Sequence, residues 1–296
     1  MDSLRVLTYN ISGQNTSALA PPGFGTAAKC AAVAAEVLRH APHLLTLQEV
    51  FLQAREPLAA ALRDAGFELC GETPSHCGMI QLWALASLRA QALRAVGPVA
   101  VARLPLPLPG GAGNGHGGAA AGGDGGYLYF AGCHLEPFAE GAGRRLKQIK
   151  AALRCLPPRG RVVLAGDCNM RNAENRSVAE LGLGDAFLQL QSPRDANFTW
   201  NTRTNLYYGD DTRQYTARYD RVLLRGLEAT QLRLVADQPR TPGGGDYLSD
   251  HFGLLATLRL SEQPPGSPPL ALRASAGPEE DGSDGGGDDL GLFGLH

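Results

Sequence analysis

The stretch Val162-Val163-Leu164-Ala165-Gly166-Asp167-Cys168-Asn169 joins an apolar run to polar side chains at the point where the run ends. Three other stretches share this pattern: Leu4 to Tyr9 before Asn10, Leu44 to Leu47 before Gln48 and Glu49, and Tyr247 to His251 before the apolar run from Leu254. Apolar runs of this kind are typical of buried strands. Strands deliver their terminal side chains to a common sheet edge, so we expect these groups to converge on one cation and one phosphate group.

Length and composition favour one large folded domain followed by a tail. The chain has 296 residues and is 44% hydrophobic, which is enough to bury a sizeable core. We place the domain at residues 1–260. Residues 261–296 contain seven acidic side chains, one basic side chain (Arg273) and eight glycines. This composition offers little apolar surface to bury, so we expect a disordered acidic tail that has its own partner.

The folded part is mildly basic once the tail is set aside. The chain has 27 Lys and Arg against 29 Asp and Glu, and removing the tail's one and seven leaves 26 and 22, a formal charge of +4. This balance suits a polyanionic partner. The sequence contains no apolar stretch long enough to span a membrane and no signal peptide ahead of the first strand, so we expect a monomer in the nucleus or cytoplasm with six reduced cysteines.

Strand and helix signals alternate along the first half of the chain. Ala-rich residues 26–40 and residues 55–66 predict helices, and residues 43–50 and 78–83 predict strands. Residues 105–126 are rich in Gly and Pro and predict a flexible loop. Further on, we expect a helix at 144–156 and strands at 127–133, 161–165, 219–224, 231–235 and 252–260. Strands dominate late and helices early, which favours mixed α/β layers over a Rossmann alternation.

Glu49 is the candidate metal ligand. It follows Leu-Thr-Leu-Gln at a strand end, and Mg²⁺ prefers hard oxygen ligands, with one or two protein carboxylates completed by water and phosphate oxygens. Taken alone, the same carboxylate could cap a helix or pair with an arginine.

Asp167 and Asn169 form a second candidate pair. Alternation along the extended backbone places both side chains on one side. Asp167 would then orient or deprotonate a water molecule, while the Asn169 amide binds a phosphoryl oxygen. A surface turn is the structural alternative.

His251, preceded by Asp250, is a candidate for stabilising the charge that builds on a phosphoryl group during displacement. A catalytic histidine needs a partner that orients its ring, and Asp220 lies at the start of another expected strand. A lone histidine at a strand end is otherwise a satisfied polar residue, so this assignment depends on the whole constellation. His43, His76, His116 and His296 have no partner signal and receive no role.

Together these motifs resemble the endonuclease/exonuclease/phosphatase superfamily of Mg²⁺-dependent phosphoesterases. The similarity follows the superfamily order from Leu4 to about Leu260 and rests on the motifs Leu-Thr-Tyr-Asn10, Leu-Gln-Glu49-Val, Gly-Cys-His134-Leu-Glu136, Gly-Asp167-Cys-Asn169, Tyr-Asp220-Arg221 and Ser-Asp250-His251-Phe-Gly. Membership implies a four-layer α/β sandwich in which two sheets pack face to face and helices cover the outside. It also implies Mg²⁺, replaceable by Mn²⁺, on Glu49 near Asn10 and Asp250, and phosphate contacts from His134 and His251.

Within the superfamily, three stretches are similar to the 5′-tyrosyl-DNA phosphodiesterases. They are His134-Leu-Glu136 with Arg145-x-x-Gln148, Gly-Asp167-Cys-Asn169-Met-Arg171, and Phe198-Thr-Trp200-Asn-Thr-x-x-Asn205 ahead of Arg218-Tyr-Asp220-Arg221. This resemblance implies hydrolysis of tyrosyl adducts at DNA 5′ ends during repair. It makes Trp200, Arg171, Asn205 and Arg145 candidate substrate-binding residues, although Trp200 could equally be a core aromatic.

The chain departs from that pattern at three places. Pro137 stands where the pattern has a small hydroxyl residue, Asn201 replaces an aspartate, and the Gly-rich segment replaces an Arg-bearing one before His134. Two alternatives therefore stay open. One is another phosphoesterase of the superfamily that acts on nucleic acid, RNA ends or lipid head groups. The other is a protein that binds DNA ends but has lost turnover.

Overall fold

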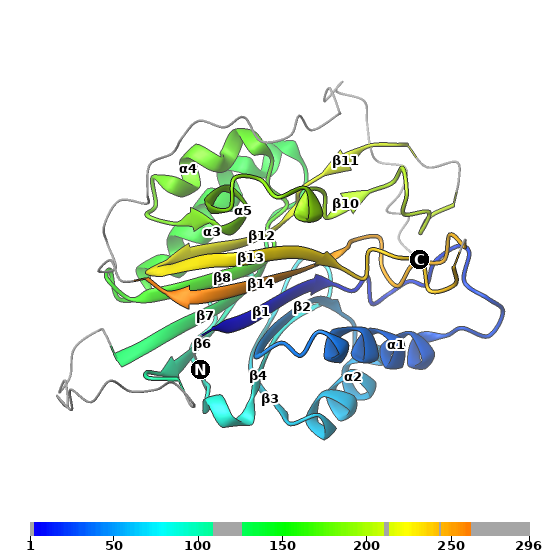
Figure 1. The fold of residues 1–296 in the computed structure, drawn as a ribbon, viewed down its shortest axis with the longest axis horizontal. Coiled ribbons are helices and arrows are strands. Elements are labelled where there is room, and N and C mark those ends of the chain that lie inside the picture. The colour runs from blue at the N-terminus through cyan, green and yellow to red at the C-terminus, as the bar shows by residue number, and fades with distance from the viewer. Residues whose placement is uncertain (1–2, 109–125, 210–212, 243, 262–296) are drawn as a thin grey trace.

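Two six-stranded sheets form the centre of the molecule in the computed structural model, which describes residues 3–108, 126–209, 213–242 and 244–261 (Figure 1). The first sheet has the order β13 (Leu227–Val235), β14 (Gly253–Leu260), β1 (Leu4–Asn10), β2 (Leu44–Val50), β4 (Met79–Leu85) and β3 (Phe67–Pro74). The second has the order β5 (Gln91–Ala92), β6 (Val99–Pro105), β7 (Tyr127–His134), β8 (Arg161–Asp167), β12 (Asp220–Arg225) and β9 (Gly184–Asp185). A short ribbon pairs β10 (Trp200–Asn201) with β11 (Thr216–Ala217).

Helices cover the outer faces of both sheets. The longer ones are α1 (Thr26–Arg39), α2 (Leu52–Asp64) and α3 (Ala142–Arg154), and the short ones are α4 (Asn175–Ala179) and α5 (Ala186–Gln189). One apolar cluster joins α1 and α2 to the first sheet, a second joins α3 and α4 to the other sheet, and a third fills the space between the sheets. Figure 1 shows α1 and α2 on one side of the strands and α3, α4 and α5 on the other. The expected four-layer α/β sandwich is confirmed.

Alternation along the strands decides which residues face the space between the sheets. In β1, Leu4 and Val6 belong to the cluster between the sheets, while Leu7 and Tyr9 pack under the helices. In β7 and β8, Phe130 and Val163 face inward in the same way. Because side chains repeat every second residue, the last residues of β1, β7 and β8 also face inward at one end of the sandwich.

The predicted elements are present, with differences at their ends, but the strand β6 and the short helices α4 and α5 were not predicted. Helix α2 begins at Leu52, before the predicted start, and accommodates Pro57 within it. Strand β3 was not predicted. It lies at the edge of its sheet, where a register shift between Leu69 and Gly71 interrupts its alternation and hides its period of two. Strand β6 extends to Pro105, so the predicted loop begins one residue later than expected.

Two predictions fall largely outside the described residues. The described residues do not include most of the predicted Gly-rich loop (109–125) or nearly all of the predicted acidic tail (262–296). Within the part of the chain that the structure describes, no helix is long and apolar enough to cross a membrane. The six cysteines are all unpaired by disulfides, as expected for reduced thiols.

Candidate active site

Three inward-facing polar residues form a row across the second sheet. The parallel pairing of β7 with β8 sets His134 opposite Asp167, and the antiparallel pairing of β12 with β8 sets Asp220 opposite the same residue. Gly166 allows this close approach, since a Cβ atom there would lie 2.0 Å from the Cys133 carbonyl oxygen. Strand register therefore brings together side chains that lie 86 positions apart in sequence.

Glu49 reaches the row because β2 is irregular at its end. Strict alternation would send Gln48 inward and Glu49 toward the helices. A register shift between Leu47 and Val50 in the β2–β4 pairing and a φ of 56° at Glu49 turn the carboxylate instead toward Asn10. The Asn10 amide nitrogen donates to Glu49 Oε1 at 3.0 Å and to Asp167 Oδ2 at 3.1 Å. Asn10 thereby links the two carboxylates across the two sheets.

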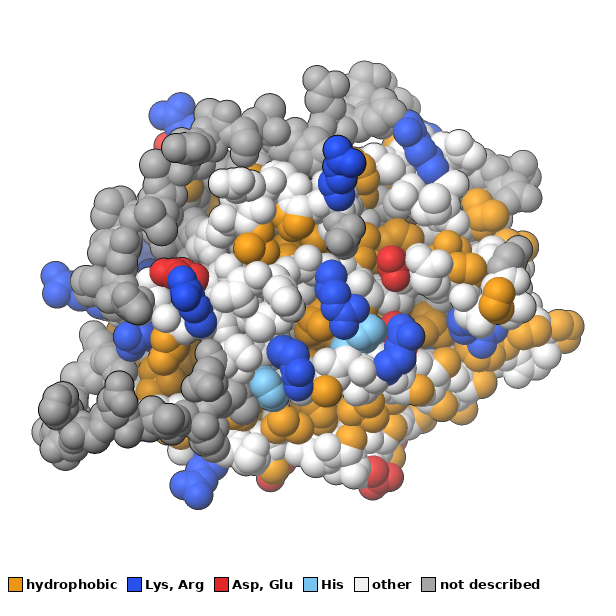
Figure 2. Space-filling model, in the orientation of Figure 1, with side chains coloured by type: hydrophobic (Ala, Val, Ile, Leu, Met, Phe, Trp, Pro, Cys, Tyr) orange, Lys and Arg blue, Asp and Glu red, His pale blue; other side chains and the backbone are white. Residues whose placement is uncertain are grey.

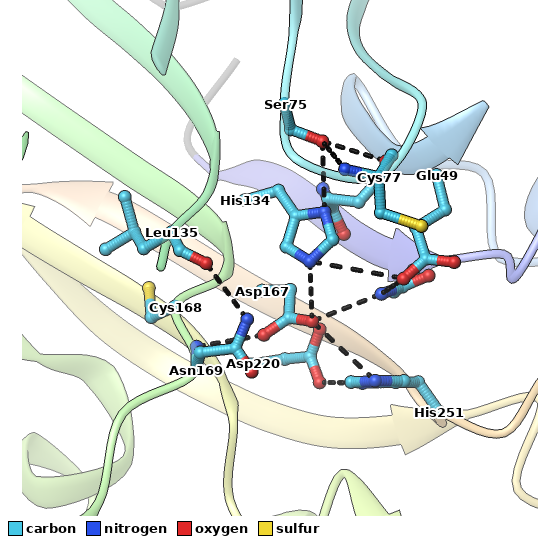
Figure 3. Close-up of polar contacts among 12 residues, drawn as sticks. Glu49, Ser75, Cys77, His134, Leu135, Asp167, Cys168, Asn169, Asp220 and His251 are labelled. Atoms are coloured by element: carbon cyan, nitrogen blue, oxygen red, sulfur yellow. Dashed lines mark hydrogen bonds and ion pairs between the residues drawn. The ribbon is translucent and has the colours of Figure 1, made fainter. Parts of the chain in front are cut away.

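Asp167 is the centre of the cluster (Figure 3). Its Oδ2 atom lies 3.4 Å from His134 Nε2 and 3.6 Å from His251 Nε2, and its side chain is 2% exposed. Burial opposes its charge, but the imidazoles of His251 and His134 outweigh burial and lower the pKa of Asp167 below its ordinary range. Asp167 is therefore a carboxylate that can accept a hydrogen bond at the point where both imidazoles converge.

His251 forms an ion pair with Asp220, as predicted. Its Nδ1 atom lies 2.8 Å from Asp220 Oδ2, and both side chains are buried. Burial alone would lower the pKa of His251, but the charges of Asp220 and Asp167 overcome it and raise the pKa well above the ordinary value. His251 is consequently an imidazolium near neutral pH.

His134 is in a different electrostatic state from His251. Burial lowers the pKa of His134 to about 4, so its ring is neutral at physiological pH. Its Nδ1 atom lies 3.3 Å from Ser75 Oγ, and the ring centre of His76 lies 4.1 Å away. Sequence reasoning missed both neighbours because the hairpin tip that carries them has no strand-end pattern. A prediction that β3 and β4 pair as a hairpin would have drawn attention to the two residues in its turn.

The residues present fit a divalent cation beside Glu49. Burial, followed by the nearby charge of Asp250, raises the pKa of Glu49 to about 7, and Asp167 adds to this repulsion. Carboxylates whose charges repel one another in this way favour a cation bound by hard oxygen ligands. Asp167, Asp220 and His251 also offer ligand atoms within 4.8 Å of one another. In that group, however, His251 and Asp220 already form an ion pair with each other, so two of the three residues are engaged.

Asp250 is fixed at the rim by hydrogen bonds. Tyr208 donates its hydroxyl to Asp250 Oδ2 at 2.5 Å, and Ser249 Oγ donates to Oδ1 at 3.1 Å. The amide of Asn205 donates to the Ser249 carbonyl at 2.9 Å. Asn205 is 4% exposed, so the structure makes it a support of the Asp250 loop rather than part of an open groove.

A buried lysine that sequence reasoning did not single out braces the same rim. Lys29 of α1 donates to the carbonyls of Ser12 and Asn15 and to the Tyr207 hydroxyl, the last at 2.8 Å. Burial lowers its pKa to about 8, partly opposed by Asp250 and Glu49. Only the fold brings this helix residue beside the loop after β1.

Aromatic side chains and arginines flank His251. The Trp200 ring meets the His251 ring edge-on at 5.0 Å and lies about 6 Å from Tyr215 and Tyr219. The Arg171 guanidinium lies 4.8 Å from the centre of the Tyr219 ring. Trp200 is half-buried rather than a core residue. Ring contacts therefore place Trp200 beside His251 and Arg171 beside Tyr219, whose ring centre lies 6.4 Å from that of His251.

Two predicted residues have positions that differ from the expectation. Strand β8 ends at Asp167, so Asn169 follows the strand with a φ of 50° instead of continuing its alternation, and its amide donates to the Leu135 carbonyl at 3.0 Å. Arg145 is 1% exposed and pairs through two nitrogens with Glu174. The structure does not bring Arg145 to the cluster, because its remaining donor group is occupied by backbone carbonyls of the segment after β7.

Comparisons with known proteins show what this chain is similar to. The model of the Endonuclease/Exonuclease/phosphatase family matches residues 7–251. Tyrosyl-DNA phosphodiesterase 2 of Danio rerio is 32% identical over 143 residues, which cover 44% of this chain and 38% of that protein. The Mus musculus protein of that name is 32% identical over 136 residues, covering 43% and 36%. The chain thus spans less than two fifths of the length of these relatives.

Solved structures show the same fold over most of the chain. The complex of D. rerio TDP2 with a single-strand DNA product superimposes with a TM-score of 0.65 at 20% identity, covering 88% of this chain and all of that one. An endonuclease/exonuclease/phosphatase family protein from Bacteroides thetaiotaomicron superimposes with a TM-score of 0.58 at 16% identity, covering 88% and 98%.

Proposed function

We propose that this chain, which belongs to the Endonuclease/Exonuclease/phosphatase family, is a Mg²⁺-dependent phosphodiesterase that hydrolyses 5′-phosphotyrosyl bonds at DNA ends. One observation carries the proposal. A buried carboxylate, Asp167, lies within 3.6 Å of a neutral imidazole and an imidazolium, beside a half-buried tryptophan. This arrangement can bind a phosphate group, accept a proton from water and stabilise the charge that develops on phosphorus.

Glu49 and Asp250 are the residues that would hold the metal ion, with Asn10 fixing the Glu49 carboxylate from behind. When bound, Mg²⁺ neutralises charge on the phosphoryl oxygens and on the departing oxygen. Mn²⁺ would serve the same donor set, because it also accepts oxygen ligands.

The chain's own side chains account for the remaining steps. Asp167 orients the attacking water and takes its proton, since its lowered pKa keeps it ionised. His251, held as an imidazolium by Asp220, donates to a phosphoryl oxygen as negative charge builds there. A bond forms between the water oxygen and phosphorus as the bond between phosphorus and the tyrosyl oxygen breaks. This leaves a 5′-phosphate and a tyrosyl phenolate, which takes a proton from solvent. His134 and Asn169 contact the phosphate from the other side.

Resemblance to the tyrosyl-DNA phosphodiesterases and the aromatic surface together support DNA as the substrate. Stacking of a base on Trp200 and a phosphate contact from Arg171 would hold a strand across this surface. Figure 2 shows several Lys and Arg side chains on the face of the molecule in view, which suits a polyanion. We infer a monomeric DNA repair enzyme of the nucleus or cytoplasm.

A turnover assay on an oligonucleotide with a 5′-tyrosyl group, with and without Mg²⁺, tests this function. Wild-type protein should release tyrosine only with the metal. Asp167→Asn and His251→Ala should each lose about 100-fold or more in kcat, while Arg176→Ala on the exposed side of α4 serves as a control. Unchanged turnover in both active-site variants would remove the assignment.

A second substrate class within the family remains a candidate because of Pro137. Proline supplies neither a hydroxyl nor a backbone N–H at the position where the resemblance implies a phosphate hydrogen bond. Abasic DNA, RNA ends and phospholipids should therefore be assayed beside tyrosyl-DNA. Faster turnover of one of them would move the assignment to that substrate. Mg²⁺-independent DNA binding without any cleavage would indicate a binding protein.

A further inference from the structure

Lys29 lies on the buried face of α1, a place that the amphipathic pattern of the helix reserves for apolar side chains. It shares this face with Val33 and Val37, which pack against the first sheet, and it is only 3% exposed. Burying an ammonium group costs free energy unless its donors find acceptors. The contacts of its Nζ atom therefore decide what this lysine does.

All three N–H groups of Lys29 have acceptors. Nζ donates to the Ser12 carbonyl at 2.7 Å, to the Asn15 carbonyl, and to the Tyr207 hydroxyl at 2.8 Å. The Tyr207 hydroxyl donates in turn to the Asn15 carbonyl at 2.7 Å, which closes the arrangement. Lys29 thus joins α1 to the loop after β1 and to the loop that carries Tyr207.

The loop after β1 connects Lys29 to the backbone of Glu49. The Ser12 carbonyl and the Gly13 N–H belong to one planar peptide group, and that N–H donates to the Glu49 carbonyl at 3.0 Å. Lys29 and Glu49 therefore hold opposite sides of the same peptide group, and donation from the ammonium polarises it and strengthens the second bond. The approach is close, since a Cβ atom on Gly13 would lie 2.2 Å from the Glu49 carbonyl oxygen.

The Tyr207 loop connects Lys29 to Asp250. Tyr208, the next residue, meets the Tyr207 ring edge-on at 5.2 Å and donates its hydroxyl to Asp250 Oδ2 at 2.5 Å. The Ala18 N–H donates to the Tyr207 carbonyl at 2.7 Å, so the backbone is fixed at this point as well. The two paths from Lys29 thus end at the two residues that would hold the metal ion.

We propose that Lys29 is a positioning residue that sets the Glu49 and Asp250 carboxylates in place before a divalent cation binds. The inference rests on the metal site of the function proposed above. The three N–H groups of Lys29 are all used by Ser12, Asn15 and Tyr207, so it acts on the carboxylates through these segments and not as an ion-pair partner. A site whose ligands are already ordered binds its cation more tightly than one that must order them first.

Amide hydrogen exchange of the metal-free protein tests these connections without cation or substrate. Lys29→Met keeps the length of the side chain and removes its donors. The Gly13 and Ala18 amides should then exchange roughly 10-fold faster than in wild type, because the segments that hold them open more often. The Val163 amide in the centre of β8 reports on the stability of the whole fold and should change less.

Two further variants complete this test. Lys150→Met, at an exposed position of α3, is the matched control and should leave the exchange of these amides unchanged. Tyr207→Phe removes only the hydroxyl that binds Lys29 and Asn15, so it should give a smaller change in the same direction even if Lys29→Met fails to fold. Wild-type exchange rates at Gly13 and Ala18 in every variant that folds would overturn the proposal.

Calorimetric titration with Mg²⁺ then separates positioning from a purely structural role. Lys29→Met and Tyr208→Phe should each weaken Mg²⁺ binding roughly 10-fold, since both disturb the support of a ligand and not the ligand itself. The double variant should lose clearly less than about 100-fold, because both side chains act on Asp250 along one path. Lys150→Met should bind Mg²⁺ as wild type does.

The outcomes distinguish this inference from the proposed function. Folded Lys29→Met protein with wild-type Mg²⁺ affinity would make Lys29 purely structural and refute the proposal, while the proposed function stands. The expected losses of affinity, together with no hydrolysis of any phosphodiester by wild-type protein, would remove the proposed function and support the role of Lys29. Wild-type protein that binds no Mg²⁺ would overturn both.

Discussion

Replacing Glu49 by glutamine should stabilise the metal-free protein and remove its response to Mg²⁺. The pKa of Glu49 rises from an ordinary 4.5 to about 7 through burial and the charge of Asp250. The folded state then holds a proton that the unfolded chain has released. Stability is therefore full below pH 4.5 and declines as pH rises through 7. Glutamine keeps the oxygen that accepts from Asn10 and carries no charge, so the variant avoids this loss.

The size of the effect follows from the difference between the two pKa values. A shift from 4.5 to about 7 corresponds to a destabilisation of about 3 kcal/mol above pH 7, at a side chain that is 20% exposed. Without metal, Glu49→Gln should exceed wild type by up to that amount at pH 8 and match it near pH 4.5. Wild type should recover about 2.7 kcal/mol at a Mg²⁺ concentration 100 times Kd, and the variant should recover none.

Urea unfolding followed by circular dichroism, with EDTA or Mg²⁺ at several pH values, measures these differences. Glu180→Gln, which alters an exposed helical ion pair, is the control and should change stability by less than about 0.5 kcal/mol at every pH. A Glu49→Gln variant that is less stable than wild type at pH 8 in EDTA, or that still gains stability from Mg²⁺, would refute this reasoning.

Three further perturbations address other parts of the site. Asp220→Asn removes the charge that raises the pKa of His251, so the alkaline limb of the pH–kcat profile should move to lower pH and kcat should fall about 100-fold; an unmoved limb would exclude a protonated His251 from the reaction. Trp200→Ala should raise KM for an oligonucleotide by about 10-fold, whereas Trp200→Phe should keep most of the stacking; equal KM values for both and for wild type would exclude base stacking there. Arg145→Ala removes a buried guanidinium and leaves the half-buried Glu174 carboxylate without this partner, which should cost about 3 kcal/mol in thermal unfolding with KM unchanged; a raised KM in folded protein would restore Arg145 to the substrate surface.

Much of the fold and the core of the site were predictable because strands alternate strictly. The apolar runs of β1, β7, β8 and β12 predict buried strands, and counting from their inward residues places Asn10, His134, Asp167 and Asp220 on the inner faces. Side-chain chemistry at those positions then suggests a metal-assisted phosphoesterase. Edge strand β3 could not be predicted in this way, because an edge strand with a register shift has no clean period.

Other features of the site depend on contacts between segments distant in sequence. Arg145 belongs to a stretch that is similar to the tyrosyl-DNA phosphodiesterases, but its charge pairs with Glu174, 29 residues away. Sequence spacing carries no information about that pairing. Ser75 and His76 occupy a short turn without a pattern of its own. They reach His134 only because the first sheet packs face to face with the second.

The sequence by itself determined the strands that carry the site, which of their side chains face inward, and which chemical groups stand at their ends, because these follow from local periodicity. Tertiary structure decided how those groups act on one another. The register shift at Glu49 turns its carboxylate toward Asn10, and packing brings Asp220 to His251. Burial keeps His134 neutral, whereas the charges of Asp220 and Asp167 keep His251 protonated. Charge and hydrogen bonding depend on distance and solvent exclusion, which are properties of the packed molecule.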